Sequence, residues 1–178
     1  MKEYQPNQQI VERAAELWVR MLRRPKYDNG DNSDAGFFAQ VLVRQIRSNV
    51  TEEKLEAFRA SLINRLMKPN ERGYYETVLC VDYSPGGALA DAAEEVGLKM
   101  EFPWKTDMYL SDRHLSLSAG HCAETKCHYP LSDGRWLITT LSGSEITKVI
   151  EYVEGGKPEF EIESQVLATI DSEAKGER

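Results

Sequence analysis

Hydrophobic side chains recur every three or four residues through the first third of the chain, which is the spacing of one helix face. This pattern predicts three helices. Asn7 caps the first, which Pro25 stops, and Thr51 caps the third, which Pro69 ends. The second follows a polar, turn-rich segment at residues 27–36. The expected apolar faces consist of Ile10, Ala14, Leu17, Trp18 and Met21, then Phe38, Val41, Leu42 and Ile46, then Leu55, Phe58, Leu62 and Leu66.

The period changes to two at residues 74–83, where β-branched and aromatic residues alternate with polar ones. Apolar residues occupy both faces of this segment, so we expect a central strand. Ser84 and Pro85 then suit the N-cap and first position of a helix, and Gly97 suits its C-terminal cap.

Short alternating segments follow at residues 107–111 and 114–118, which predict antiparallel strands. Between residues 127 and 141 two strand-like segments flank Asp133-Gly134, a strong hairpin signal because glycine accepts a positive φ. Ser142 and Glu145 have the spacing of a capping box for a last helix. Residues 160–163 suit an edge strand.

These elements predict an α+β fold in which a three-helix N-terminal layer packs on a mainly antiparallel sheet with two further helices. We expect residues 1–178 to form a single domain. Residues 1–70 are its helical part and residues 73–164 its α+β part, while residues 172–178 form a frayed tail.

Charge divides the chain unevenly. The net charge is −7, yet residues 1–72 carry 13 basic and 10 acidic side chains, so the rest of the chain is strongly acidic. An acidic body repels phosphates, which makes nucleic-acid binding unlikely. No apolar segment approaches the roughly 18 residues of a membrane span, and three cysteines cannot all pair, so we expect a cytoplasmic protein without a membrane partner.

Thiol and imidazole side chains, the usual zinc ligands, gather near residue 121. The candidate ligands are His114, His121, Cys122, Cys127 and His128. Their spacing lacks a second cysteine pair, and neighbouring residues on a strand point to opposite faces. We therefore expect no metal and no cofactor, although a small enzyme or metal-binding protein built on this cluster stays an alternative.

A second candidate site lies at the expected strand-to-helix junction. Ser84, Gly86 and Gly87 would bring backbone N–H groups near an anion at a helix N-terminus. No Gly-Lys-Ser/Thr follows, as a phosphate-binding loop of the Walker type requires. A capped helix start is the favoured interpretation, and a phosphate or nucleotide binder stays an alternative.

The sequence shows no catalytic signature such as GxSxG, so an enzyme is not favoured. Aromatic side chains of the β-rich half could provide anchors at an interface if they are exposed. The candidates are Tyr109, Tyr129 and Trp136. Packing within the sheet is the commoner role of such rings.

The segments MKEYQPNQQ, FPWKTDMYL and HYPLSDGRWLITT resemble the small uncharacterised accessory proteins of phages and prophages of enteric bacteria. The resemblance covers chain length, opening residues and aromatic-polar strands, and it carries no functional residue over. It implies a protein that acts by binding a host component. The sequence thus favours a non-enzymatic protein with a protein partner, whether or not it also forms a homo-oligomer.

Overall fold

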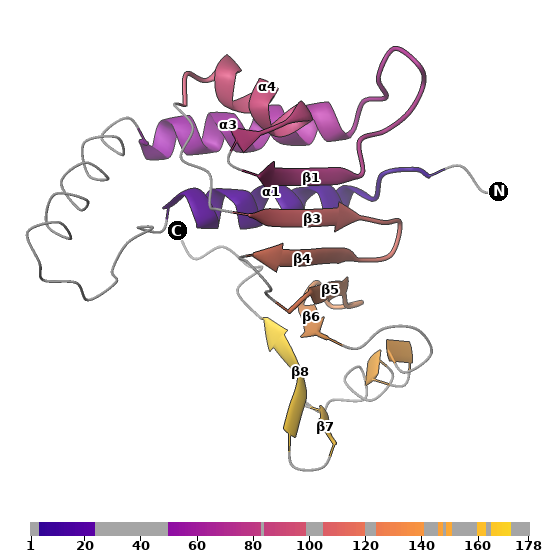
Figure 1. The fold of residues 1–178 in the computed structure, drawn as a ribbon. Coiled ribbons are helices and arrows are strands. Elements are labelled where there is room, and N and C mark those ends of the chain that lie inside the picture. The colour runs from indigo at the N-terminus through magenta and orange to yellow at the C-terminus, as the bar shows by residue number, and fades with distance from the viewer. Residues whose placement is uncertain are drawn as a thin grey trace, which may run out of the picture.

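A computed structural model describes residues 4–23, 50–82, 84–98, 105–119, 124–140, 146–147 and 149–150, and the backbone of 160–162 and 165–171. Figure 1 shows helices packed along an antiparallel sheet, which confirms the α+β class. The first and third predicted helices are α1 (Gln8–Arg23) and α3 (Glu52–Leu66). The second, expected after residue 36, lies outside the described residues. So does the predicted tail, and the single-domain organisation stays a prediction.

Both helices begin at the predicted capping residues. The Asn7 side-chain oxygen accepts a hydrogen bond from the Gln9 backbone N–H at 3.0 Å. The Thr51 hydroxyl accepts one from the Lys54 backbone N–H at 3.2 Å. Each side chain satisfies a donor that the first helical turn leaves without a partner.

The two helices pack against each other through their apolar faces. On α1 the predicted positions Leu17 and Met21 are only partly buried, whereas Arg13 is almost fully buried. The apolar side chains that these helices bury completely or nearly so are Ile10, Val11, Ala14, Ala15, Trp18, Val19, Leu22, Leu55, Phe58, Leu62 and Leu66.

The predicted start of the next helix was wrong. Ser84 and Pro85 form the short strand β2 (Ser84–Pro85), which turns back onto β1 (Val78–Asp82). This pairing keeps both residues extended, so α4 (Gly87–Glu95) begins only after Gly86. Its end is as predicted: Gly97 has a φ of +62°, and the Leu98 N–H donates to the Ala93 carbonyl at 2.9 Å.

The described strands form one sheet in the order β2-β1-β3-β4-β5-β6-β8-β7, and every neighbouring pair is antiparallel. The remaining bounds are β3 (Thr106–Leu110), β4 (Leu115–Ala119), β5 (Lys126–Pro130), β6 (Trp136–Thr139), β7 (Phe160–Ile162) and β8 (Gln165–Asp171). The strands predicted near residues 107–111 and 114–118 and the edge strand near 160–163 are confirmed.

Two predictions about the sheet need correction. β1 starts at Val78, not near residue 74, and is not central, because only the two-residue β2 lies on its outer side. The sequence interpretation also missed β8, which inserts between β6 and the edge strand β7. The alternation of Val166, Ala168 and Ile170 was the signal for it.

The sheet has a hydrophobic core on each face. On the first face, α1 packs against β3 and α4 against β1, and side chains such as Leu79, Met108 and Leu115 are fully buried there. The second core gathers around β5 and β6, where Ile146 and Val149 cover the sheet. Residues 146–147 and 149–150 are helical, as expected, whereas the predicted capping residues of that helix lie outside the described part.

The hairpin between β5 and β6 confirms the predicted turn. The Gly134 N–H donates to the Leu131 carbonyl at 3.0 Å, and the Leu131 N–H donates to the Arg135 carbonyl at 2.9 Å. Asp133 accepts a hydrogen bond from the Arg135 backbone N–H at 3.0 Å. Gly134 has a φ of +83°, so this three-residue loop requires the left-handed conformation there.

We predict that Gly134→Val lowers the free energy of unfolding by about 1–3 kcal/mol, because a β-branched residue is strained at positive φ. No atom lies within 4 Å of the position that a Cβ would take, so backbone strain alone sets the cost. Urea titration measures it. Gly134→Asn is the control and should cost clearly less, since asparagine tolerates this conformation. Equal losses for both variants would contradict the explanation.

Candidate functional site

One row of cross-strand partners shows how unevenly the second face of the sheet is covered. The row runs from Val78 through Tyr109, Ser116 and Cys127 to Thr139. Val78 is 44% exposed and Tyr109 is 53% exposed, whereas Cys127 and Thr139 are buried. Ile146, Val149 and Ile150 thus cover the β5–β6 end of this face, and no described residue covers the β1–β3 end in the same way.

The predicted interface aromatics separate along this row. Tyr109 lies at the open end and meets the condition of exposure. Tyr129 and Trp136 do not meet it, because they are 8% and 6% exposed. Tyr129 belongs to the covered core, and Trp136 packs on the opposite face against the helices.

We define the open half of the second face by Val78, Cys80, Asp107 and Tyr109, whose strands β1 and β3 pair in register. Cys80 lies on this surface and is exposed. Partial desolvation and the neighbouring Asp107 carboxylate raise the pKa of its thiol. The thiol is therefore a poor nucleophile at neutral pH.

The described part of the His/Cys cluster forms packing contacts. The His114 ring stacks on Tyr129 with ring centroids 5.0 Å apart, and the Cys127 Sγ lies 3.5 Å from the Ser116 hydroxyl. Partial burial lowers the pKa of His114. His128 is buried beside Leu115 in register.

The remaining two candidates, His121 and Cys122, lie outside the described residues. Within the described part, no group of three or more His, Cys, Asp or Glu side chains is placed to hold a metal ion. The absence of a metal site therefore stays a prediction.

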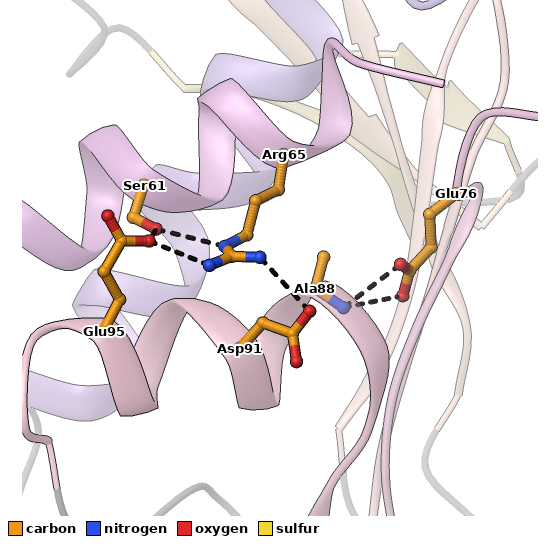
Figure 2. Close-up of polar contacts among 6 residues, drawn as sticks. All are labelled: Ser61, Arg65, Glu76, Ala88, Asp91 and Glu95. Carbon is orange, nitrogen blue, oxygen red and sulfur yellow. Dashed lines mark hydrogen bonds and ion pairs between the residues drawn. The ribbon is translucent and has the colours of Figure 1, made fainter. Parts of the chain in front are cut away.

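The proposed anion site at the start of α4 already holds a carboxylate of the protein. Figure 2 shows Glu76 facing the first turn, where both carboxylate oxygens lie 3.1 Å from the Ala88 N–H that donates to them. Gly87 has a φ of +52°, and a Cβ there would overlap the Glu76 side chain. Glu76 thus takes the place expected for a phosphate beside Gly86 and Gly87, and binding of an external anion stays a prediction.

The same figure shows what fixes α4 to α3. Arg65 lies between two carboxylates of α4 and donates to Asp91 at 3.2 Å and to Glu95 at 2.9 Å. The Ser61 hydroxyl adds a hydrogen bond of 2.6 Å to Glu95. These contacts lower the pKa of Glu95, with the Ser61 hydrogen bond as the largest cause. The network is structural and joins two helices at the surface.

A polar pocket of about 220 Å³ lies between α1, α3 and the β5–β6 hairpin. Its lining consists of Gln9, Glu12, Arg13, Glu16, Arg59, Pro130, Gly134 and Trp136. The side chain of Arg13 is 1% exposed, and its guanidinium carbon lies 5.3 Å from the centre of the Trp136 ring. Stacking on an aromatic face compensates part of the cost of burying this charge.

The sequence interpretation did not single out any charged residue of this pocket. The signal was available for Arg13, which falls three residues after Ile10 on the apolar face of the first helix. A charged residue on such a face must be paired, stacked or placed in a cavity. Arg59, by contrast, comes from a distant segment and shows no local signal.

Comparisons with known proteins add nothing to this geometry. No protein-family model matches the chain, and no curated protein matches it. The described helices include none that is both long and apolar enough to cross a lipid bilayer.

We predict that the half-buried carboxyl of Glu76 makes stability depend on pH. Burial raises its pKa above the ordinary value of 4.5, and the Ala88 hydrogen bond opposes this effect less strongly. The folded state then binds more protons than the unfolded state, so stability is lost as pH rises through the raised pKa. As pH rises from below 4.5 toward neutral, Glu76→Gln should therefore gain stability relative to the parent.

Urea titrations over that pH range measure the effect. Glu94→Gln, an exposed change on α4, the helix that Glu76 contacts, is the control and should not show this pH-dependent gain. If the stability of Glu76→Gln also changes with pH in parallel with the parent, the carboxyl of Glu76 is not the cause of the pH dependence.

We predict that the purified protein holds no tightly bound zinc, because the spacing of the His and Cys residues does not provide the four ligands of a tetrahedral site. Elemental analysis checks this directly, and a chelator should leave the thermal unfolding midpoint unchanged. About one zinc per chain would contradict the prediction. Substitution of Cys122 and Cys127 by serine would then show whether the cluster binds it.

Proposed function

We propose that the protein is a non-enzymatic binding protein that contacts a protein partner through the open half of its second sheet face. The observation that carries this proposal is the pair Val78 and Tyr109, which are direct cross-strand partners and both largely exposed. Apolar side chains that stand side by side on rigid strands form a preformed contact surface.

Tyrosine suits this role physically. Its ring supplies apolar contact area, its hydroxyl keeps a polar end, and only two torsions are lost on binding. Asp107 lies two residues from Tyr109 on the same face, and Asp82 lies at the other end of β1, so both provide charge on this surface. A central ring with polar surroundings is the usual arrangement of an interface whose energy depends on a few residues.

The charge of the chain indicates the kind of partner. Residues 73–178 hold 19 acidic and 9 basic side chains, so the body that carries the open half attracts a basic surface. The resemblance to phage and prophage accessory proteins would make this partner a host component. We propose the basic protein partner on charge, and its host origin on that resemblance.

The proposal predicts position-specific crosslinking. A photoreactive amino acid in place of Tyr109 should crosslink in cells to a discrete protein, because the open half would lie against the partner. The same amino acid in place of Ala57, an exposed position on α3, should not give that product. Gel analysis and mass spectrometry identify the products.

Matched substitutions complete the test. Tyr109→Lys should abolish the crosslink from a second reporter at Val78, whereas Ala57→Lys, which adds the same charge, should leave it intact. The proposal would be overturned if reporters at Tyr109 and Ala57 gave the same product in equal yield, or if the reporter at Tyr109 gave no crosslink.

A further inference from the structure

The polar pocket between α1, α3 and the β5–β6 hairpin holds two opposite charges that form no ion pair with the described part of the chain. Glu12 and Arg59 both line it and are both half-buried. No ion pair joins either of them to a residue within the described ranges, so they do not contact each other across the hollow. Both groups are therefore open to a ligand that carries the opposite charge, since a charge-assisted hydrogen bond is stronger than a neutral one.

The neighbouring charges of the pocket are accounted for. Glu16 bonds to Arg20 at 2.6 Å and lies 3.5 Å from Arg13, so its carboxylate is compensated. Glu12 receives a hydrogen bond of 2.8 Å from the neutral amide of Gln8, which leaves its charge in place. The pocket thus offers one guanidinium and one carboxylate to whatever enters it.

We propose that this pocket binds a small zwitterion of the amino-acid type. The carboxylate of the ligand pairs with Arg59, which presents a planar fork suited to two parallel hydrogen bonds. The ammonium group of the ligand pairs with Glu12. A simple anion would match Arg59 but be repelled by Glu12, and a simple cation would match Glu12 but be repelled by Arg59.

Size narrows the ligand further. A volume of about 220 Å³ is below the range of roughly 300–1,000 Å³ typical of drug-sized ligands, so the ligand is small. Trp136 and Pro130 add apolar surface to the wall. A free amino acid carries its carboxylate and its ammonium group on the same carbon, and its short side chain can contact the apolar surface of Trp136 and Pro130. The proposal is independent of the protein interface on the second sheet face.

Isothermal titration of the full chain with each standard L-amino acid at neutral pH tests the proposal. We expect at least one amino acid to bind, and acetate and methylammonium to bind far more weakly because each matches a single charge. Arg59→Gln and Glu12→Gln should each weaken binding about tenfold or more, since each removes a charge-assisted hydrogen bond. Arg113→Gln and Glu56→Gln change exposed charges outside the pocket and should leave affinity unchanged.

Thermal unfolding confirms that the four variants are folded before binding is compared. If no amino acid binds at millimolar concentration, the proposal is wrong. It is equally wrong if acetate binds as tightly as the best amino acid, or if the pocket variants bind as the surface variants do. The double exchange Glu12→Arg with Arg59→Glu should recover part of the affinity, because it restores one charge of each sign.

Discussion

Successive side chains of a strand point to opposite faces, so every interior strand has two surfaces that need cover. The helices α1, α3 and α4 satisfy this requirement on the first face, where Leu79, Met108 and Leu115 are buried. On the second face, the described residues that pack over the sheet are Ile146, Val149 and Ile150. They belong to the core that contains Cys127 and Tyr129, whereas Tyr109 is exposed. Within the described part of the chain, the division of that face into a core and an open surface follows from the position of these three residues.

Local chemistry could be read from the sequence, and non-local pairing could not. The caps at Asn7 and Thr51, the turn at Gly134 and the helix end at Gly97 each depend on a few neighbouring residues, and all four are as predicted. The start of α4 depends on where Ser84 and Pro85 find a pairing partner. Their local signal favours a helix, but hydrogen bonding to β1 favours a strand, and the pairing decides.

The candidate sites follow the same rule. Tyr109, Tyr129 and Trp136 share one chemical character in the sequence, yet one is exposed and two are buried. Their positions along the sheet and the face they occupy make the difference, and neither is encoded within a few residues. Arg13 was within reach of sequence reasoning as a charge on an apolar helix face. Arg59 was not, because its place opposite Glu12 arises only when α1 and α3 pack.

The attachment of α4 determines when this helix can form. Nine residues are too few for a helix that is stable alone in water, and contacts from elsewhere hold its two ends. Glu76 binds its first turn, and Lys54 donates a hydrogen bond of 3.0 Å to the Gly97 carbonyl just beyond its last turn. Neither contact exists until α3 and the segment before β1 are in place. We therefore expect the amide hydrogens of α4 to exchange with solvent through the same opening event that separates α4 from α3, so that the two helices behave as one cooperative folding unit.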